Sequence, residues 1–204
     1  MRALGLAPGE MIGHVVALAA HPDDLEIGCG GTLLTLAEAY PGLTADVVVA
    51  TGDAERVAEA KHALDLFLPG CSVSLHCGGL PDGRLPAVWA ELKELLEETA
   101  TGRRPDLVLG PRRTDLHQDH RTLAELVRTV WRDHLVLGYE IPKWDGDLDR
   151  PWLYVPLSEA VLRAKIRLLH EAYPSQAGRD WFDPEVFGGL ARLRGMECLS
   201  LIHI

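Results

Sequence analysis

Short apolar runs alternate with longer amphipathic segments along most of this chain, and this alternation limits the folds it can adopt. The runs, such as Val15-Val16-Ala17-Leu18-Ala19, are typical of strands buried on both faces. Segments with helical periodicity separate them. A strand followed by a helix and another strand usually gives parallel strands. The sequence therefore predicts an α/β fold: a mostly parallel sheet of about five or more strands, with helices on both faces.

The boundaries of these elements follow from the periodicity and from the Gly and Pro residues that interrupt it. Strands are expected over residues 14–20, 45–51, 71–77, 107–110 and 135–141. Helices are expected over residues 30–40, 54–67, 86–100, 120–132 and 159–172, with a last one near 184–194. Residues 142–156, rich in Trp, Asp, Gly and Pro, are expected to form a long loop of the kind that often shapes a pocket.

The size, charge and cysteine content of the chain restrict its class. Its 204 residues fit one domain. A formal net charge of −10 would repel phosphate backbones, so nucleic acid is not an expected partner. No stretch approaches the roughly 18–20 apolar residues that span a bilayer, and residues 1–13 lack the order of a signal peptide. The four cysteines form no paired motif, so we expect buried free thiols and a cytoplasmic protein.

The last six residues are unusual. Residues 199–204 read Leu-Ser-Leu-Ile-His-Ile, which resembles the translation of a transposon adapter used in sequencing libraries. We therefore expect a single domain over residues 1–198 that is truncated at its C-terminus, followed by a non-native tail over residues 199–204. An ordinary apolar terminal strand is the alternative. The nucleotide sequence tests this hypothesis, because codons that diverge from the adapter would refute it.

Two polar clusters follow two of the expected strands. The first is Ala20-His21-Pro22-Asp23-Asp24, and the second is Asp115-Leu116-His117-Gln118-Asp119-His120. In open parallel sheets, ligands bind outside the carboxyl ends of the strands, so we expect the two clusters to lie together there. Their three imidazoles and several carboxylates are a suitable set of ligands for a metal ion.

His21, Asp24 and His120 are the expected metal ligands. His21 and Asp24 lie three residues apart, and Pro22 limits the backbone between them, so a turn brings both side chains toward one point. Three protein ligands plus water is the arrangement of catalytic zinc, whereas structural zinc usually has four protein ligands. We expect one zinc ion per chain, with Fe²⁺ or another divalent ion as the alternative.

Amide hydrolysis needs further groups, and the same clusters contain them. Asp23 is expected to be the base that takes a proton from water and later protonates the departing amine. A protonated His117 would support the oxyanion or the leaving nitrogen. Asp119 is expected to orient His117 and to raise its pKa.

Several motifs beyond these clusters recur in one known order. They are Glu26 and Gly28-Cys29-Gly30-Gly31 after the first cluster, Thr51-Gly52-Asp53, Arg56-x-x-Glu59, Leu80-Pro81-Asp82-Gly83, His117-x-Asp119-His120, Lys165 and Ser175-Gln176. With the first cluster, they resemble the zinc-dependent N-deacetylases called PIG-L or LmbE-like. The resemblance covers almost the whole chain. It implies a Rossmann-like fold and hydrolysis of an N-acetyl group, typically on a glucosamine-containing substrate.

The resemblance also implies roles for individual residues. It gives His21, Asp24 and His120 as zinc ligands, Asp23 as the base, and His117 as the electrostatic stabiliser with Asp119 as its partner. By the same resemblance, Arg56 and Asp82 are expected to contact sugar hydroxyls. The alternatives for these two are an Arg–Glu surface pair and an Asp-Gly turn. Asp115 departs from the pattern, because some members have a tyrosine there.

Other interpretations of the clusters remain open. The His-Pro-Asp run is also typical of a helix N-cap, and Asp115 or Asp119 could equally cap the helix after them. Two histidines and one carboxylate also form the facial triad of iron(II) oxygenases, although we associate those enzymes with a β-barrel scaffold. A non-catalytic sugar-binding protein of the same fold is a third interpretation.

Overall fold

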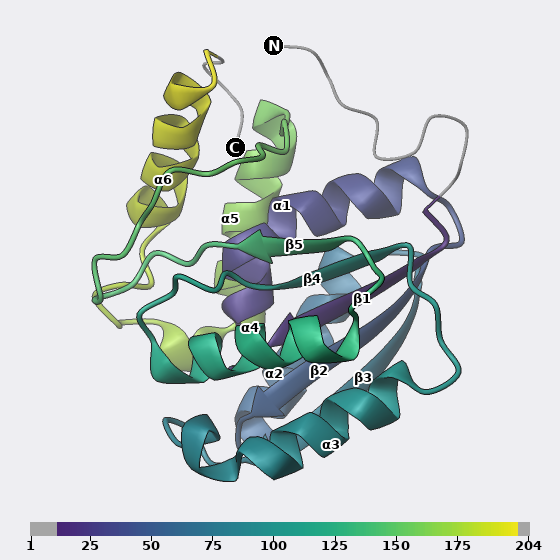
Figure 1. Ribbon diagram of the computed structural model, residues 1–204. Helices are drawn as coiled ribbons and strands as arrows, with labels where there is room; N and C mark the ends of the chain where they lie inside the picture. The colour runs from purple at the N-terminus through teal and green to yellow at the C-terminus, as the bar shows by residue number, and fades with distance from the viewer. Residues whose placement is uncertain (1–11, 200–204) are drawn as a thin grey trace.

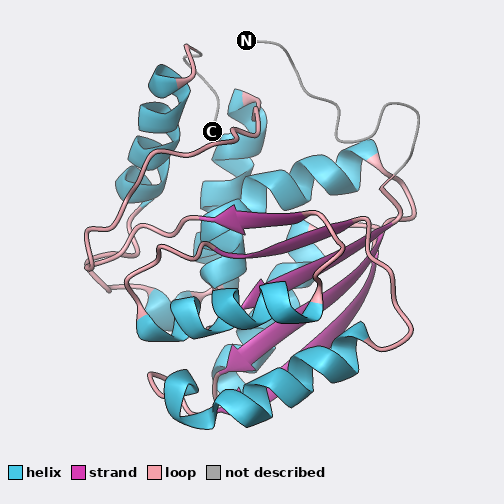
Figure 2. Ribbon diagram, in the orientation of Figure 1, coloured by secondary structure: helices cyan, strands magenta, loops and turns pink. Residues whose placement is uncertain are grey.

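The computed structural model describes residues 12–199, which form one sheet with helices around it (Figures 1 and 2). All neighbouring strands pair in parallel, in the order β3-β2-β1-β4-β5. The predicted Rossmann-like α/β class is confirmed. The strands are β1 (His14–Ala19), β2 (Thr44–Thr51), β3 (Ser72–Leu80), β4 (Leu107–Pro111) and β5 (Val136–Tyr139).

Helices cover both faces of the sheet, as expected (Figure 1). Helices α1, α2 and α5 share an apolar cluster on one face, and α3 and α4 share another on the opposite face. The helices are α1 (Asp24–Ala39), α2 (Ala54–Phe67), α3 (Trp89–Ala100), α4 (Gln118–Val130), α5 (Glu159–Ala172) and α6 (Pro184–Glu197), with short 3₁₀ helices η1 (Leu85–Val88) and η2 (Pro174–Gln176).

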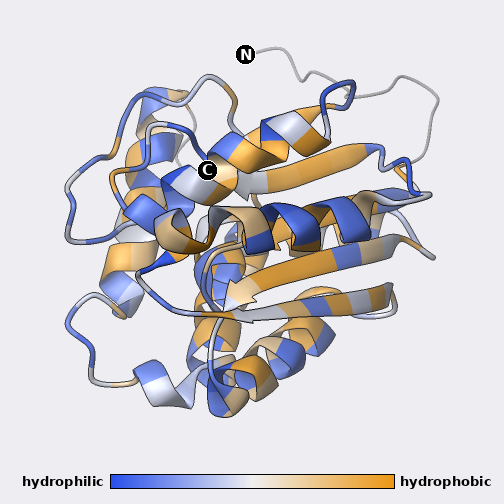
Figure 3. Cartoon of the chain, turned by 60° about the horizontal axis from the view of Figure 1, so that its bottom comes forward, coloured by the Kyte–Doolittle hydropathy of each residue, from blue (hydrophilic) through white to orange (hydrophobic). Residues whose placement is uncertain are grey.

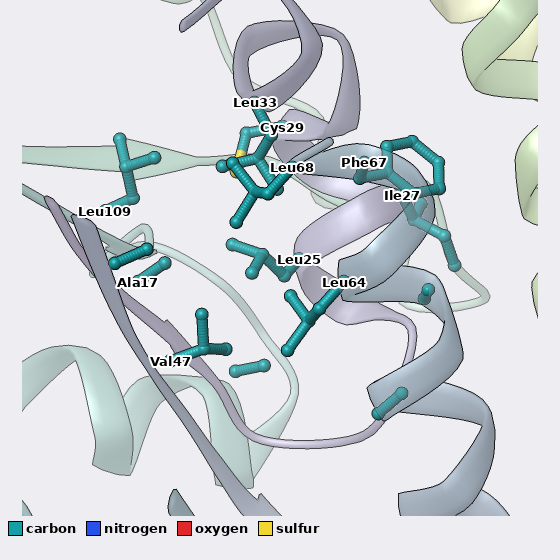
Figure 4. Packing of buried hydrophobic residues seen from close by; sticks show 14 of the residues in the cluster. Ala17, Leu25, Ile27, Cys29, Leu33, Val47, Leu64, Phe67, Leu68 and Leu109 are labelled. Carbon is teal, nitrogen blue, oxygen red and sulfur yellow. The ribbon is translucent and has the colours of Figure 1, made fainter. Parts of the chain in front are cut away.

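The central strands are apolar throughout because each of their faces packs against helices. In β1, Val15 and Ala17 enter the cluster with α1 and α2, while Val16 and Leu18 enter the cluster with α3 and α4. Figure 4 shows the first cluster, in which Leu25 and other helix residues lie over the strands. Figure 3 shows the result in colour: the strands are largely hydrophobic, and the helices alternate hydrophobic and hydrophilic positions.

Helix α1 begins at Asp24, six residues before its expected start at residue 30. Three glycines lie inside it, and its backbone is kinked at Cys29. Glycine weakens an isolated helix, so local propensity does not favour helix in this stretch. Here close packing requires them: a Cβ on Gly28 would lie 2.2 Å from Tyr139 Cδ2, and one on Gly30 would lie 2.6 Å from Phe67 Cε1. Tertiary contacts therefore outweigh the local propensity.

The remaining boundaries agree with expectation to within a few residues. Helices α2 and α5 begin and end where they were predicted. Strand β3 continues to Leu80, three residues past its expected end at 77. Helix α4 spans Gln118–Val130 rather than 120–132.

The structure tests two expectations from the composition. All four cysteines are free; Cys29 and Cys198 are buried, whereas Cys71 is half-buried and Cys77 is exposed, so burial was predicted correctly for only two. Within residues 12–199, no helix is both long and apolar enough to cross a membrane. Of the expected non-native tail, residues 200–204 lie outside the described residues.

Candidate functional site

The two polar clusters lie together at the carboxyl edge of the sheet. Strand β1 pairs directly with β4, and one cluster follows the end of each strand. In the order β3-β2-β1-β4-β5, the connections leave β1 on one side and resume at β4 on the other. This is the topological switch point, where open α/β sheets bind their ligands. The predicted meeting of the clusters is confirmed.

Three side chains converge on one point at this junction. The distance from His21 Nδ1 to Asp24 Oδ2 is 3.2 Å, that from His120 Nε2 to Asp24 Oδ2 is 3.2 Å, and that between the two nitrogens is also 3.2 Å. Zinc bonds of about 2.0–2.1 Å in a tetrahedron place neighbouring donor atoms about 3.3 Å apart. The triangle therefore has the size of three ligands on one tetrahedral metal ion, with the fourth position open. We call these three residues the metal centre.

Each histidine of the metal centre has a carboxylate on its other nitrogen. His21 Nε2 lies 3.1 Å from Asp119 Oδ2, and His120 Nδ1 lies 3.1 Å from Asp115 Oδ2. Both carboxylates are fully buried. Metal-binding histidines commonly have such partners, which fix the ring orientation and make the ligating nitrogen more basic. The carboxylates behind His21 and His120 therefore fit a metal site, as the three converging donor atoms do.

The charges around these imidazoles favour a cation. Burial opposes a charge on His21, but the Asp24 carboxylate and hydrogen bonds to carboxylates outweigh it and raise the pKa of His21 to about 12. Burial also opposes a charge on His120, while Asp24 and Asp115 raise its pKa to about 9. Burial would raise the pKa of Asp24, yet the two imidazoles hold it well below its usual range. A metal ion would supply positive charge at this point.

His117 provides a third imidazole beside the metal centre. Its ring centroid is 4.6 Å from that of His120 and 5.0 Å from that of His21. Nitrogen atoms of the three histidines all lie within 4.8 Å of one another. His117 Nδ1 accepts the backbone N–H of Asp119, so a neutral ring carries its proton on Nε2. Burial and the charges on His120 and His21 lower the pKa of His117 and outweigh the opposing charge of Asp119, so the expected rise in this pKa and the expected protonated ring are wrong.

The Asp119 carboxylate was expected to contact His117, and this prediction is wrong. The Asp119 carboxylate lies against His21 and accepts the backbone N–H groups of Gly83 and Leu85, at 2.7 and 3.0 Å. Only the backbone N–H of Asp119 reaches His117. The first turn of α4 directs the carboxylate toward the loops after β1 and β3. Asp119 therefore orients the His21 side chain.

Asp23 is buried in an unusual backbone conformation. Its φ of 100° is rare for a residue with a side chain, and such strain costs about 1–3 kcal/mol and concentrates at functional sites. Asp23 occupies the N-cap position of α1, but its carboxylate makes no capping hydrogen bond. Burial and the charge of Asp24 raise its pKa to about 7, although Arg56 opposes this shift. A carboxyl group in this range can both take and give a proton.

Arg56 binds protein groups with both terminal nitrogens. Nη2 donates to Asp23 Oδ2 at 2.7 Å and to the carbonyl oxygen of Pro22. Nη1 donates to Glu59 Oε2 at 2.7 Å and to Ser175 Oγ at 3.2 Å. The Arg56 side chain is only 17% exposed, so its pair with Glu59 is not a surface pair. The structure places this guanidinium against Asp23.

Asp82 lies at the mouth of the site. Its side chain is 77% exposed, and Oδ1 is 3.1 Å from His21 Nε2. The following Gly83 has φ of +71°, so the Asp-Gly turn that was the alternative interpretation is also present. The turn presents the Asp82 carboxylate to solvent beside the metal centre, so the turn and a substrate contact are compatible.

Sequence reasoning missed two groups behind His120. Asp115 was considered only as a helix cap and as a departure from tyrosine, yet its carboxylate holds His120 and also accepts Lys143 Nζ at 2.9 Å. The available signal was an acidic residue five positions before a ligand histidine. Lys143 comes from the long loop after β5 and carried no local signal. The cap of α4 is His117, not an aspartate.

Comparisons with known proteins extend over most of the chain. Residues 16–131 match the PIG-L family, described as GlcNAc-PI de-N-acetylase. The chain is 30% identical over 140 residues to the "uncharacterized deacetylase YaiS" of Escherichia coli K12, and the match covers 63% of this chain and 74% of YaiS.

Solved structures share the fold. The N,N'-diacetylchitobiose deacetylase of Pyrococcus horikoshii aligns with a TM-score of 0.70 and 18% identity, covering 94% of this chain and 81% of that one. GalB, the 4-carboxy-2-hydroxymuconate hydratase of Pseudomonas putida KT2440, aligns with a TM-score of 0.67 and 17% identity, covering 93% and 92%. A deacetylase and a hydratase thus share this fold, so the fold alone does not select the reaction. The family match includes both polar clusters and more than half of the sequence, and the chain belongs to the PIG-L family of metal-dependent deacetylases.

Proposed function

We propose that this protein is a zinc-dependent hydrolase that removes an N-acetyl group from an amino-sugar substrate of the N-acetylglucosamine type. The observation that carries the proposal is the triangle of His21, Asp24 and His120 donor atoms, 3.2 Å apart, with a buried carboxylate behind each histidine. Membership of the PIG-L family supports deacetylation. The family description and the diacetylchitobiose deacetylase support an acetylated sugar as the substrate class.

His21 Nδ1, Asp24 Oδ2 and His120 Nε2 would hold the metal. Bound zinc polarises a carbonyl group and makes water acidic enough to ionise near neutral pH. Asp119 and Asp115 keep the two imidazoles in the ligating tautomer and orientation. Nitrogen and carboxylate donors suit zinc, and they also suit iron. We favour zinc because this open parallel sheet is not the β-barrel that we associate with iron(II) oxygenases.

The protein's own groups move the protons. Asp23 takes a proton from water as the water oxygen forms a bond to the acetyl carbonyl carbon. His117 donates from Nε2 to the carbonyl oxygen as negative charge develops there. The carbon–nitrogen bond then breaks, and Asp23 passes its proton to the departing amine. The products are acetate and the free amino sugar.

We assign Arg56 to positioning rather than to sugar binding. Its hydrogen bond to Asp23 Oδ2 fixes the carboxylate of a residue whose backbone is strained. Asp82 keeps the proposed contact with a sugar hydroxyl, because its exposed carboxylate faces solvent beside His21.

A screen for acetate release tests the proposal. The purified chain is loaded with zinc, its metal content is measured, and it is incubated with free, conjugated, lipid-linked and nucleotide-linked N-acetyl amino sugars. We expect about one zinc per chain, and acetate release that a chelator stops and zinc restores. Zinc binding with no acetate from any substrate would contradict the proposal and favour a non-catalytic sugar-binding protein. Iron binding with turnover of 2-oxoglutarate would contradict it in favour of an oxygenase.

A further inference from the structure

A separate cavity of about 620 Å³ lies along the outer edge of β5, the last strand of the sheet. It is lined by β5, by parts of α1 and α4, and by residues 149–155 of the loop that passes outside the sheet. Small-molecule sites are typically about 300–1,000 Å³, so the cavity has a suitable size. The cavity is not lined by His21, His117 or His120. This cavity is distinct from the metal centre.

The walls of the β5 cavity are apolar on both sides of the strand. Leu137 and Tyr139 come from β5 itself, Val127 from α4, and Leu157 from the segment before α5. Such walls match the acyl, aryl or alkyl part of a ligand, because burying apolar surface there is favourable.

A buried lysine also lines the cavity. Lys165 of α5 is 6% exposed, and its Nζ donates to the carbonyl oxygen of Ile27 at 2.7 Å. An ammonium group has three donors, and within residues 12–199 Lys165 makes no direct ion pair, although the charge of Glu140 acts on it. Burial lowers the pKa of Lys165 to about 8, so it remains mostly protonated at neutral pH. A buried cation that no carboxylate contacts directly is costly, and an anionic ligand on Nζ would lower that cost.

Further cationic groups line the cavity. Arg113, Arg128 and Arg150 are exposed lining residues, and none makes an ion pair within the described part of the chain. Arg112 also lines the cavity; its Nη2 already pairs with Asp147 Oδ1 at 2.9 Å, while its Nε is buried without a hydrogen-bond partner. Two acidic residues line the cavity as well. Glu140 is already bound by Arg194, at 2.6 and 2.7 Å, and Asp149 is exposed and accepts the backbone N–H of Arg150. This gathering of cations is notable because the whole chain carries a net charge of −10.

We propose that the β5 cavity binds a small amphiphilic anion, with its carboxylate or phosphate head on Lys165 and its apolar part along β5. The inference uses no residue of the metal centre and does not depend on the proposed deacetylation. The head group could belong to a free organic acid or to an anionic lipid, because both present the same chemistry.

Calorimetry with decanoate and the uncharged 1-decanol tests the proposal. We expect one decanoate per chain, and we expect Lys165→Met to weaken decanoate binding at least about tenfold while decanol binding changes little. Lys61→Met, at an exposed lysine on α2, is the matched control and should bind as the unaltered chain does. Leu137→Trp, which fills the cavity and keeps Lys165, should weaken both ligands.

Three results would overturn the proposal: no decanoate binding by the unaltered chain, equal decanoate affinity in the Lys165→Met variant, or equal affinity in the Leu137→Trp variant. Light scattering gives a further test, because a dimer that closes the cavity to decanoate would show that a second copy fills it. Sedimentation with phosphatidylglycerol vesicles separates the two sources. Sedimentation that decanoate prevents would identify a lipid head group, and decanoate binding without sedimentation would identify a free acid.

Discussion

Two clusters of this protein combine two histidines with an aspartate, and they include residues at opposite ends of β1. One is the metal centre, which follows the carboxyl ends of β1 and β4. The other, which we call the Asp46 cluster, consists of His14, Asp46, His76 and Arg103 and begins at the first residue of β1. The two share a composition, yet they differ in how the donor atoms are arranged.

The Asp46 cluster distributes its contacts over both carboxylate oxygens. His14 Nε2 lies 2.8 Å from Oδ2, and His76 Nε2 lies 2.8 Å from Oδ1. Arg103 adds a permanent positive charge 3.1 Å from Oδ2. The two histidine nitrogens thus contact different oxygens, and the carboxylate already has a cation.

In the metal centre, both histidine nitrogens approach the same oxygen of Asp24 and also each other. Like nitrogens at 3.2 Å need a proton or a cation between them. Convergence of donor atoms on one point, rather than residue composition, therefore marks a metal site.

Loss of a histidine should remove bound zinc when the histidine belongs to the metal centre and should leave it unchanged when the histidine belongs to the Asp46 cluster. We expect His120→Ala to reduce bound zinc from about one ion per chain to nearly none and to abolish acetate release, because a metal ligand is gone. His76→Ala removes a histidine from the Asp46 cluster and should retain the zinc. Metal analysis after dialysis measures both. Equal zinc contents in the two variants would contradict the assignment.

Removal of the proposed base should separate binding from catalysis. We expect Asp23→Ala to retain zinc and to lower kcat about 10²–10⁴-fold, which is the usual contribution of a positioned acid–base group. Initial rates of acetate release, with metal content measured on the same sample, test this. Unchanged activity would refute the role of Asp23.

The carboxylates behind the histidines should affect metal affinity. We expect Asp119→Asn to weaken zinc binding about 10–100-fold, because the hydrogen bond that orients His21 is weakened. Competition with a fluorescent zinc chelator measures the affinity. A variant that binds zinc as tightly as the unaltered chain would show that this contact does not tune the site.

The contact between Asp119 and His21 could not be predicted from the sequence. The five strands, the two polar clusters and helices α2 and α5 could be predicted, because periodicity and neighbouring residues determine them locally. The Asp119–His21 contact joins residues 98 positions apart, and the first turn of α4 decides where the carboxylate points. His117 was expected as the partner of Asp119 because the two residues are close in the sequence. The same limit applies to Arg56, whose contact with Asp23 depends on how α2 packs beside α1.

Arginine substitutions in the two regions should distinguish positioning from substrate binding. We expect Arg56→Met to lower kcat about tenfold with little change in KM, because Asp23 loses the group that fixes it. Arg103→Met, in the Asp46 cluster, is the control and should alter neither constant. Should Arg56→Met instead raise KM at constant kcat, Arg56 would be a sugar contact.

The Asp46 cluster should contribute to stability alone. We expect Asp46→Asn to lower the free energy of unfolding by about 1–2 kcal/mol and to leave zinc content and activity unchanged. Burial would raise the pKa of Asp46, but hydrogen bonds with His76 and His14 and the charge of Arg103 lower it. The ionised carboxylate therefore stabilises the fold above its ordinary pKa of about 4, and this stabilisation is lost as pH falls below that value.

Denaturation of the Asp46→Asn variant and the unaltered chain at pH 7 and at decreasing pH tests this account. The difference in unfolding free energy between the variant and the unaltered chain should become smaller as the pH falls below about 4. A difference that widens as pH falls would contradict the assigned direction of the pKa shift. Loss of zinc from the variant would show that the two clusters are not independent.

The most direct test of the whole account is an anomalous difference map, at the zinc absorption edge, from crystals of the zinc-loaded protein. Convergent donors at the metal centre predict one strong peak, about 2.0–2.2 Å from His21 Nδ1, Asp24 Oδ2 and His120 Nε2. A peak at the Asp46 cluster, or no peak among the three converging donors, would contradict the central claim.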